Sequence, residues 1–386
     1  MGNETMADIE RKAGAKWAEA AWERALAKTL RVSRRIGAEF PHASQGGSYG
    51  LEAPHWWTAG FWPGMLLLLD EGGRAPELRE IAERCEERLD AVLDGYDKLD
   101  HDLGFMWVPT SVYRYKRTGA EDSRRRAFKA AQYLMGRFNL QGRYIRAWNP
   151  WFEGDDNAGL AIIDCSMNTS LLYWASRESG DPRYRHAANA HMDTVVKHFV
   201  REDGSVRHIV RFDPETGEAL EALGGQGWSP ESGWSRGTAW ALYGLALAYH
   251  HTGREPYLNA SKRVAHYFLS QLPEDGVPHW DFRAPEDTLH LRDSSAGSCA
   301  ASGLLLLAGL VPPAESASYW RAGVRLLRAL DERCGAWDDP AEEGLLRHGT
   351  SHYPERKHLD VPLIYGDYFF VEALARLRGA DVIGWE

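Results

Sequence analysis

Cysteine is scarce in this sequence, and long apolar runs are missing. The four cysteines lie far apart and form no CxxC pair, which argues against a disulfide framework or a zinc ribbon and favours a reducing compartment. The apolar runs 65–69 and 304–310 are far too short to cross a bilayer. Residues 1–12 are polar and lack the apolar core of a signal peptide. We therefore expect a soluble, cytoplasmic protein with no membrane partner.

Basic tracts and metal motifs are also missing. The formal net charge is -10, and the densest basic run is Arg124–Arg126, at the start of an expected helix. A nucleic acid would meet bulk repulsion, so we expect no nucleic-acid partner. The sequence has no HExxH, no CxxC and no clustered His/Cys set, so we expect no metal and no cofactor.

Tryptophan, in contrast, is abundant, with sixteen residues in a chain of 386. Many stand in polar, glycine-rich stretches and form three clusters: Trp56, Trp57 and Trp62; Trp148 and Trp151; and Trp228, Trp234 and Trp240. A flat apolar ring with one N–H donor suits the C–H face of a sugar. The other interpretation is that these rings fill the centre of a wide barrel. Taken together, the clusters favour sugar stacking.

Helical periodicity is nearly continuous, and strand-like alternation is almost absent. Gly119, Gly180 and Gly253 each follow an apolar helix and precede a more polar one, as expected for a left-handed helix stop followed by an antiparallel helix. The three glycines are spaced by roughly 60–70 residues, and repeats of this length indicate helix pairs stacked side by side. The expected helices are 12–37, 58–71, 76–95, 105–118, 121–138, 165–179, 182–200, 234–252, 255–272, 294–310, 315–333 and 366–378.

Twelve helices make six hairpins, which can close into a double ring, the (α/α)6 barrel. We expect an all-α, single-domain chain over residues 1–386, with residues 1–11 as a flexible tail. Five connections exceed the usual loop length, and loops this long tend to be functional. These connections are 39–57, 139–163, 201–233, 273–293 and 335–365.

Two aspartates stand at the starts of expected helices. Asp102 follows His101 on a turn, and Asp164 follows the apolar residues 161–163. Either aspartate could simply cap its helix. An apolar flank, however, raises the pKa of a carboxyl, as a general acid working near neutral pH requires. Asp164 is therefore the candidate proton donor.

The segment 225–240 combines two indoles with a glutamine and an arginine. Arg236 offers a planar fork suited to a carboxylate, although it could equally pair with a protein acid. Asp293 is expected to cap a helix, and His208 by default is an ordinary loop histidine.

Together these motifs resemble glycoside hydrolase family 88, the unsaturated glucuronyl hydrolases. They run in the family's order from about residue 50 to 378. The matching residues are Trp57-Thr58-x-Gly60-Phe61-Trp62, His101-Asp102-x-Gly104-Phe105, Ile163-Asp164-Cys165-x-x-Asn168, Asp203-Gly204-Ser205 with His208, Gln226-Gly227, Trp234-x-Arg236-Gly237-x-Ala239-Trp240 and Tyr365-Gly366-Asp367-Tyr368.

The resemblance implies an (α/α)6 barrel without metal or cofactor that removes a 4,5-unsaturated uronic acid from the non-reducing end of lyase-generated acidic oligosaccharides, such as glycosaminoglycan fragments. It implies hydration of the C4=C5 vinyl ether, with Asp164 as general acid/base and Asp102 as the second carboxylate. The residues at substrate-binding positions are Trp57, His101, His208, Gln226, Trp234, Arg236 and Trp240.

Two departures leave the neighbouring sugar open: Thr238 replaces the family's usual glutamine, and segment 354–358 is atypical. An unsaturated rhamnogalacturonyl hydrolase is the alternative on the same fold, although the motif at His101 and Gln226 argue against it. A sugar 2-epimerase would need paired histidines on inner helices, which we do not find. A non-catalytic sugar-binding repeat module would tolerate loss of Asp164.

Overall fold

Helices alternate along the chain between a half-exposed type and a fully buried type. The computed structural model describes residues 6–386. Helix α2 (Phe61–Leu69) is buried at every position, whereas the next helix, α3 (Pro76–Gly95), buries one face only. The other helices are α1 (Met6–Ile36), α4 (Leu103–Trp107), α5 (Tyr113–Thr118), α6 (Glu121–Gly136), α7 (Cys165–Ser179), α8 (Pro182–Thr194), α9 (Ser235–Thr252), α10 (Glu255–Ser270), α11 (Ser294–Leu310), α12 (Pro313–Cys334) and α13 (Ile364–Arg378).

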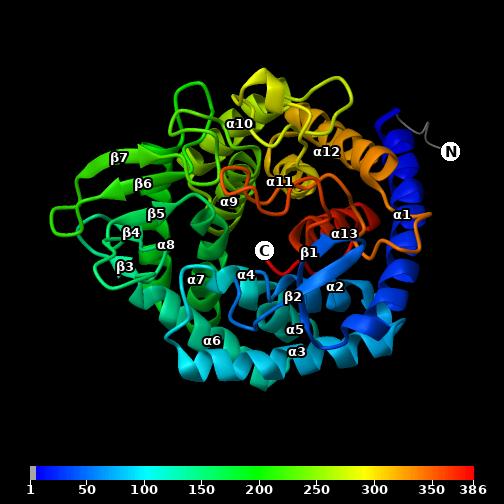
Figure 1. Ribbon diagram of the computed structural model, residues 1–386, viewed down its shortest axis with the longest axis horizontal. Coiled ribbons are helices and arrows are strands. Elements are labelled where there is room, and N and C mark those ends of the chain that lie inside the picture. The colour runs from blue at the N-terminus through cyan, green and yellow to red at the C-terminus, as the bar shows by residue number, and fades with distance from the viewer. Residues whose placement is uncertain (1–5) are drawn as a thin grey trace.

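The buried helices form a closed inner ring. Contacts run from α2 through the π-helical turn Val108–Val112 and α4 to α7, then to α9, α11 and α13, and back to α2. The half-exposed helices α1, α3, α6, α8, α10 and α12 lie outside this ring (Figure 1). The predicted (α/α)6 barrel is therefore confirmed.

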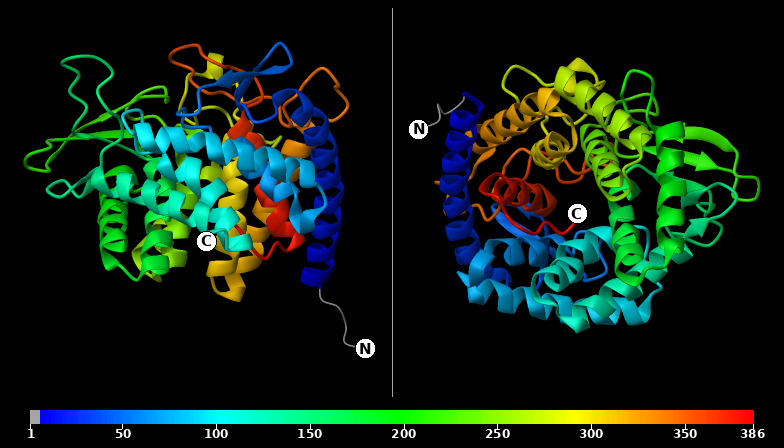
Figure 2. Two further views of the ribbon diagram at one scale, coloured as in Figure 1. Left: turned by 90° about the horizontal axis from the view of Figure 1, so that it is seen from below. Right: turned by 180° about the vertical axis from the view of Figure 1, so that it is seen from behind.

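Tight turns and long connections lie at different ends of the helices. Gly119, Gly180 and Gly253 end α5, α7 and α9 with φ of 70°, 73° and 66°, the left-handed conformation that glycine adopts at least cost. Each turn leads from an inner helix to an outer one. Five of the six return connections, from outer to inner helices, are long, and they gather along one edge of the ring (Figure 2).

Helix boundaries follow the prediction closely. The ranges 76–95, 165–179 and 294–310 are those of α3, α7 and α11. The helix predicted over 105–118 begins at Leu103 and contains a π-helical turn. The expectation of a tail over residues 1–11 is wrong for residues 6–11, which belong to α1, while residues 1–5 lie outside the described range.

Short strands occur within the long connections, where the sequence predicted almost none. Strands β1 and β2 pair as an antiparallel hairpin, as do β3 and β4, and β5, β6 and β7 form a three-stranded sheet. Among residues 6–386 no helix is both long and apolar enough to span a membrane. The strands are β1 (Phe40–Gln45), β2 (Ser48–Glu52), β3 (Phe138–Asn139), β4 (Tyr144–Ile145), β5 (Leu160–Ile162), β6 (Ile209–Phe212) and β7 (Ala219–Leu223).

Candidate active site

Asp164 stands where β5 ends and α7 begins. The preceding Ile163 is fully buried, and its N–H donates to the carbonyl of His208, which holds this junction against the sheet. The Asp164 side chain makes no capping hydrogen bond, so the capping interpretation does not hold. Its side chain keeps 15% of its surface exposed, and Oδ1 has no hydrogen-bond partner among the described residues. Burial, aided by the charge of Asp100, raises the pKa of Asp164 to about 7.

Asp102 precedes α4 and faces Asp164 from the neighbouring helix. It also makes no capping bond. Its backbone N–H donates to Asp100 Oδ1 at 2.9 Å, and its own Oδ1 accepts from Asn168 Nδ2 at 3.1 Å. Burial, with the nearby Asp100 and Asp164, raises the pKa of Asp102 well above its ordinary range. Asp102 and Asp164 have carboxylate oxygens within 4.8 Å of each other. Two buried carboxyls at this separation favour sharing a proton over carrying two charges.

His101 lies beside both carboxylates. Its Nε2 is 3.6 Å from Asp102 Oδ1 and 3.9 Å from Asp164 Oδ1. The ring is fully buried, and neither nitrogen has a hydrogen-bond partner among the described residues. Burial, with the positive charge of Arg137, lowers the pKa of His101 well below its ordinary value, so the ring is neutral. The side chains of His101, Asp102 and Asp164 place one ligand atom each within 4.8 Å of one another, close enough for a single metal ion to bind all three.

Residues from just before β6 to the start of α9 form another side of the candidate active site. His208 packs against the Trp234 ring at 4.3 Å between centroids, and the N–H of Gln226 lies 2.9 Å from His208 Nδ1. His208 Nε2 is buried and has no hydrogen-bond partner within residues 6–386. Burial lowers the pKa of His208 to about 3, so this ring is also neutral. The default interpretation of His208 as an ordinary loop residue does not fit this setting.

Arg236 sits in the first turn of α9 and is 1% exposed. Nη1 pairs with Asp293 and donates to the Thr350 carbonyl at 2.7 Å. Nη2 donates to Gln226 Oε1 at 2.7 Å and to the Ser351 carbonyl at 2.6 Å. Both terminal nitrogens already have protein acceptors, so a uronate carboxylate would have to share them or displace Gln226.

The tryptophans divide between core and surface. Trp57 is half-buried and packs against Tyr365 at 5.0 Å. Trp240 is 1% exposed and packs against Phe105, so its place agrees with the barrel-filling interpretation. Trp151 and Trp228 are 67% and 47% exposed. The clusters therefore do not behave as one set.

Three residues near the carboxylates had no assigned role in the sequence interpretation. Asn168 donates a hydrogen bond to the Asp102 side chain, and Asp100 accepts one from the Asp102 backbone N–H. Arg137 supplies a nearby positive charge. Asn168 follows Asp164 by four residues on α7, a spacing that places both on one helix face. That spacing could have identified it. Asp293 caps α11 as expected, by accepting from the Ser295 N–H, and also pairs with Arg236.

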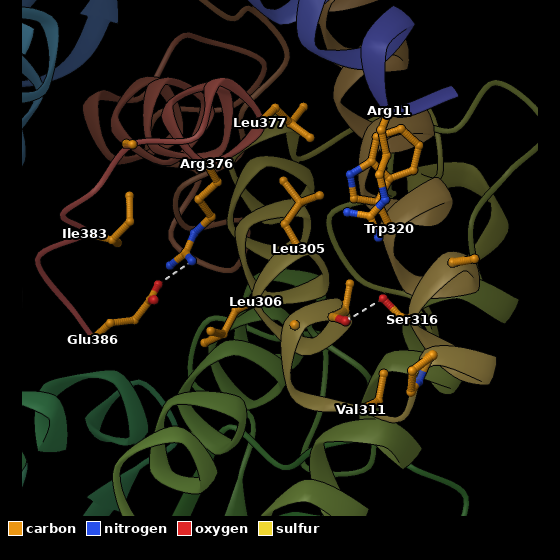
Figure 3. A pocket seen from close by; sticks show the side chains of 15 residues that line it. Arg11, Leu305, Leu306, Val311, Ser316, Trp320, Arg376, Leu377, Ile383 and Glu386 are labelled. Carbon is orange, nitrogen blue, oxygen red and sulfur yellow. Dashed lines mark hydrogen bonds and ion pairs between the residues drawn. The ribbon is translucent and has the colours of Figure 1, made fainter. Parts of the chain in front are cut away.

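A pocket of about 770 Å³ lies elsewhere, at the carboxyl ends of α11 and α13 (Figure 3). Leu305, Trp320 and the ion pair of Arg376 with Glu386 are among its lining. The candidate residues Asp102, Asp164 and Arg236 stand instead at the amino ends of inner helices. The pocket is therefore distinct from the candidate active site.

Comparison with known proteins agrees with this architecture. Residues 32–277 match the family described as Glycosyl Hydrolase Family 88. The chain is 38% identical over 366 residues to the unsaturated glucuronyl hydrolase of Bacillus sp. (strain GL1), covering 92% of this chain and 97% of that protein.

Solved structures give the same result. The crystal structure of the Bacillus sp. GL1 enzyme, described as responsible for the degradation of glycosaminoglycan, superposes with a TM-score of 0.91 at 36% identity, covering 95% of this chain and 98% of that one. A mutant of the Streptococcus agalactiae unsaturated glucuronyl hydrolase complexed with dGlcA-GalNAc6S superposes with a TM-score of 0.84 at 31% identity, covering 96% and 94%.

Proposed function

This chain belongs to Glycosyl Hydrolase Family 88 and is a glycoside hydrolase that releases a 4,5-unsaturated uronic acid from lyase-generated oligosaccharides, and we propose that Asp164 is its proton donor. The observation that carries this assignment is the Asp164 carboxyl itself. It stands at the edge of an apolar segment with Oδ1 free, and its pKa is raised to about 7. A carboxyl in that state keeps its proton near neutral pH and can deliver it.

The reaction begins at the vinyl ether of the terminal uronate. Asp164 protonates C4, because the ring oxygen stabilises the positive charge that then develops at C5. Water attacks C5 as a nearby base takes its proton, which gives a hemiketal at C5. The bond from C5 to the ring oxygen then breaks to give a ketone, and the hemiacetal left at C1 collapses to an aldehyde and releases the neighbouring sugar. The sequence and geometry leave the general base as either Asp164, once it has given up its proton, or Asp102.

Asp102 takes the role of the second carboxylate, which holds the sugar hydroxyls. The distances from His101 Nε2 to both carboxylates let this neutral ring help to orient the substrate between them. A proton shared within this group requires no metal ion, and we propose that the enzyme works without one.

An acidic sugar needs positive potential within a protein of net charge -10. The amino ends of α7, α9 and α11 stand at Asp164, Trp234 and Asp293, and helix amino ends attract anions. Arg236 adds a fixed positive charge beside Gln226. We assign the uronate to this region, with His208 Nε2 as a further hydrogen-bonding atom.

The remaining substrate-binding residues are aromatic. Trp234 packs against His208, Trp57 packs against Tyr365 and Phe105, and Trp240 packs against Phe105 as well and so supports Trp57. We propose glycosaminoglycan fragments as the substrate class. The Bacillus relative is described as degrading glycosaminoglycan, and the streptococcal relative was solved in complex with dGlcA-GalNAc6S.

We further propose that the chain acts as one catalytic domain in the cytoplasm. One buried hydrophobic cluster includes residues from α1 through Trp385, which supports a single domain. All four cysteines are buried and free, which supports a reducing compartment.

The test of this function is direct. Purified protein is incubated with disaccharides prepared by a polysaccharide lyase, and the ultraviolet absorbance of the conjugated enol ether is followed. Loss of this absorbance together with release of the neighbouring sugar supports the proposal. Binding of the disaccharide without turnover would instead indicate a sugar-binding module.

A further inference from the structure

One buried amide joins the two segments that carry the carboxylates. Asn168 is 0% exposed and lies on α7, one turn after Asp164. Its Oδ1 accepts the backbone N–H of Phe105, on α4, at 2.8 Å. Its Nδ2 donates to Asp102 Oδ1 at 3.1 Å and lies 3.3 Å from the Asp164 carbonyl. The amide therefore contacts both helices at the point where the carboxylates face each other.

The orientation of this amide is determined by its partners. A backbone N–H only donates, so the atom that faces Phe105 must be the amide oxygen, and the amide nitrogen must face Asp102. Asp102 Oδ1 is thereby fixed as a hydrogen-bond acceptor. Its other oxygen, Oδ2, receives no hydrogen bond from the described residues and stays available to a ligand.

Backbone packing holds this arrangement in place. A Cβ added at Gly104 would lie 2.4 Å from the Asn168 Cα, closer than real Cβ atoms approach. Glycine at this position lets α4 approach α7 closely enough for the amide to bridge them. The hydrogen bonds therefore rest on two packed helices and not on flexible side chains.

The other polar groups around Asp102 do not fix its rotation. Asp100 and Asp164 donate no hydrogen bond to it among the described residues, Arg137 acts on it only as a nearby charge, and His101 Nε2 is 3.6 Å away. Asn168 is the side chain that hydrogen-bonds Asp102 within residues 6–386.

We propose that Asn168 is a positioning residue that fixes the rotation of the Asp102 carboxylate, so that Oδ2 faces the hydroxyls of the bound sugar. This inference rests on the proposed function, in which Asp102 holds those hydroxyls. Asn168 touches no substrate and acts only through Asp102. Its loss should therefore weaken the same kinetic parameter, KM or kcat, that loss of Asp102 weakens.

The experiment measures kcat and KM on an unsaturated disaccharide for five variants. Asn168→Ala removes the amide, and Asn168→Leu removes it while keeping the branched shape and the same number of side-chain heavy atoms, in case the alanine variant does not fold. Asp102→Asn and the double variant Asp102→Asn/Asn168→Ala complete a double-mutant cycle. Ser170→Ala is the matched control, because Ser170 is buried on the same helix and its Oγ has no hydrogen-bond partner among the described residues.

Asn168→Ala and Asn168→Leu should each lower kcat/KM by about 10- to 100-fold, the effect expected when a hydrogen bond to a charged group is removed. The double variant should lose little beyond Asp102→Asn, because the two residues act as a unit. Ser170→Ala should match wild type.

Two results would overturn the inference: folded Asn168 variants within about threefold of wild type, or losses that multiply across the cycle. An inactive wild type would overturn the proposed function instead, so the two failures are distinguishable.

Discussion

Replacing Arg236 by alanine should damage stability and substrate recognition together, and Asp293→Asn separates the two effects. The Arg236 and Asp293 side chains are 1% and 0% exposed and form an ion pair. Removing one partner of such a pair leaves a buried charge without compensation and typically costs about 3–5 kcal/mol. Both variants should therefore show a reduced free energy of unfolding, measured by chemical denaturation, of about this size.

Activity should divide the two variants. Hydrogen bonds to a charged group contribute about 1.5–3 kcal/mol, so Arg236→Ala should lower kcat/KM by roughly 10- to 100-fold. Arg236→Lys should recover only part of this loss, because lysine lacks the planar fork. Asp293→Asn keeps the guanidinium, and with it the positive charge that the uronate requires.

The deciding assay compares a disaccharide with its uronate methyl ester, at a temperature where every variant is folded. Wild type and Asp293→Asn should discriminate strongly against the ester, whereas Arg236→Ala should discriminate little. If Arg236→Ala shows the same ester penalty as wild type, Arg236 does not sense the carboxylate. Its four protein acceptors would then describe its whole role, that of a structural tie.

Three further predictions follow from the site. Because Asp164 must be protonated to act and its pKa is raised to about 7, kcat/KM should be full below this pH and fall as the pH rises through it; a rise in kcat/KM across the same range would contradict the assignment. Exhaustive dialysis against a chelator should leave kcat/KM unchanged, whereas a loss that zinc or calcium restores would show that His101, Asp102 and Asp164 hold a metal ion. Gly104→Ala should destabilise the protein by about 1–3 kcal/mol, as overpacking does, and should lower activity because Asp102 shifts. The control is Gly136→Ala, where an added Cβ meets nothing within 4 Å; it should be neutral or stabilising by up to about 1 kcal/mol. Equal effects of the two substitutions on the free energy of unfolding would refute the packing argument.

The helical framework could be predicted because its signals are local. Apolar periodicity and the glycine stops at Gly119, Gly180 and Gly253 indicate each hairpin without reference to the rest of the chain. The strands could not be predicted in this way. β5 is three residues long and is held by pairing with β6, about fifty residues later in the chain, and such pairing leaves little periodicity in a short segment.

Site residues followed the same division. The apolar flank of Asp164 predicts its raised pKa from neighbouring residues alone, and the structure agrees. The surroundings of Arg236 depend on Asp293 and on the carbonyls of Thr350 and Ser351, which are more than fifty residues away in sequence. No local pattern indicates these partners. The burial of Trp240 against Phe105 is likewise a product of ring closure.

The central claim is that Asp164 delivers the proton that begins cleavage. Its most direct test is a comparison of wild type with Asp164→Asn, which keeps the shape of the side chain and removes the proton. Single-turnover loss of the enol-ether absorbance should slow by about 10²–10⁴, the usual contribution of general acid catalysis, while disaccharide affinity and thermal unfolding stay near wild type. A folded Asp164→Asn variant that keeps more than about a tenth of the wild-type rate would contradict the claim.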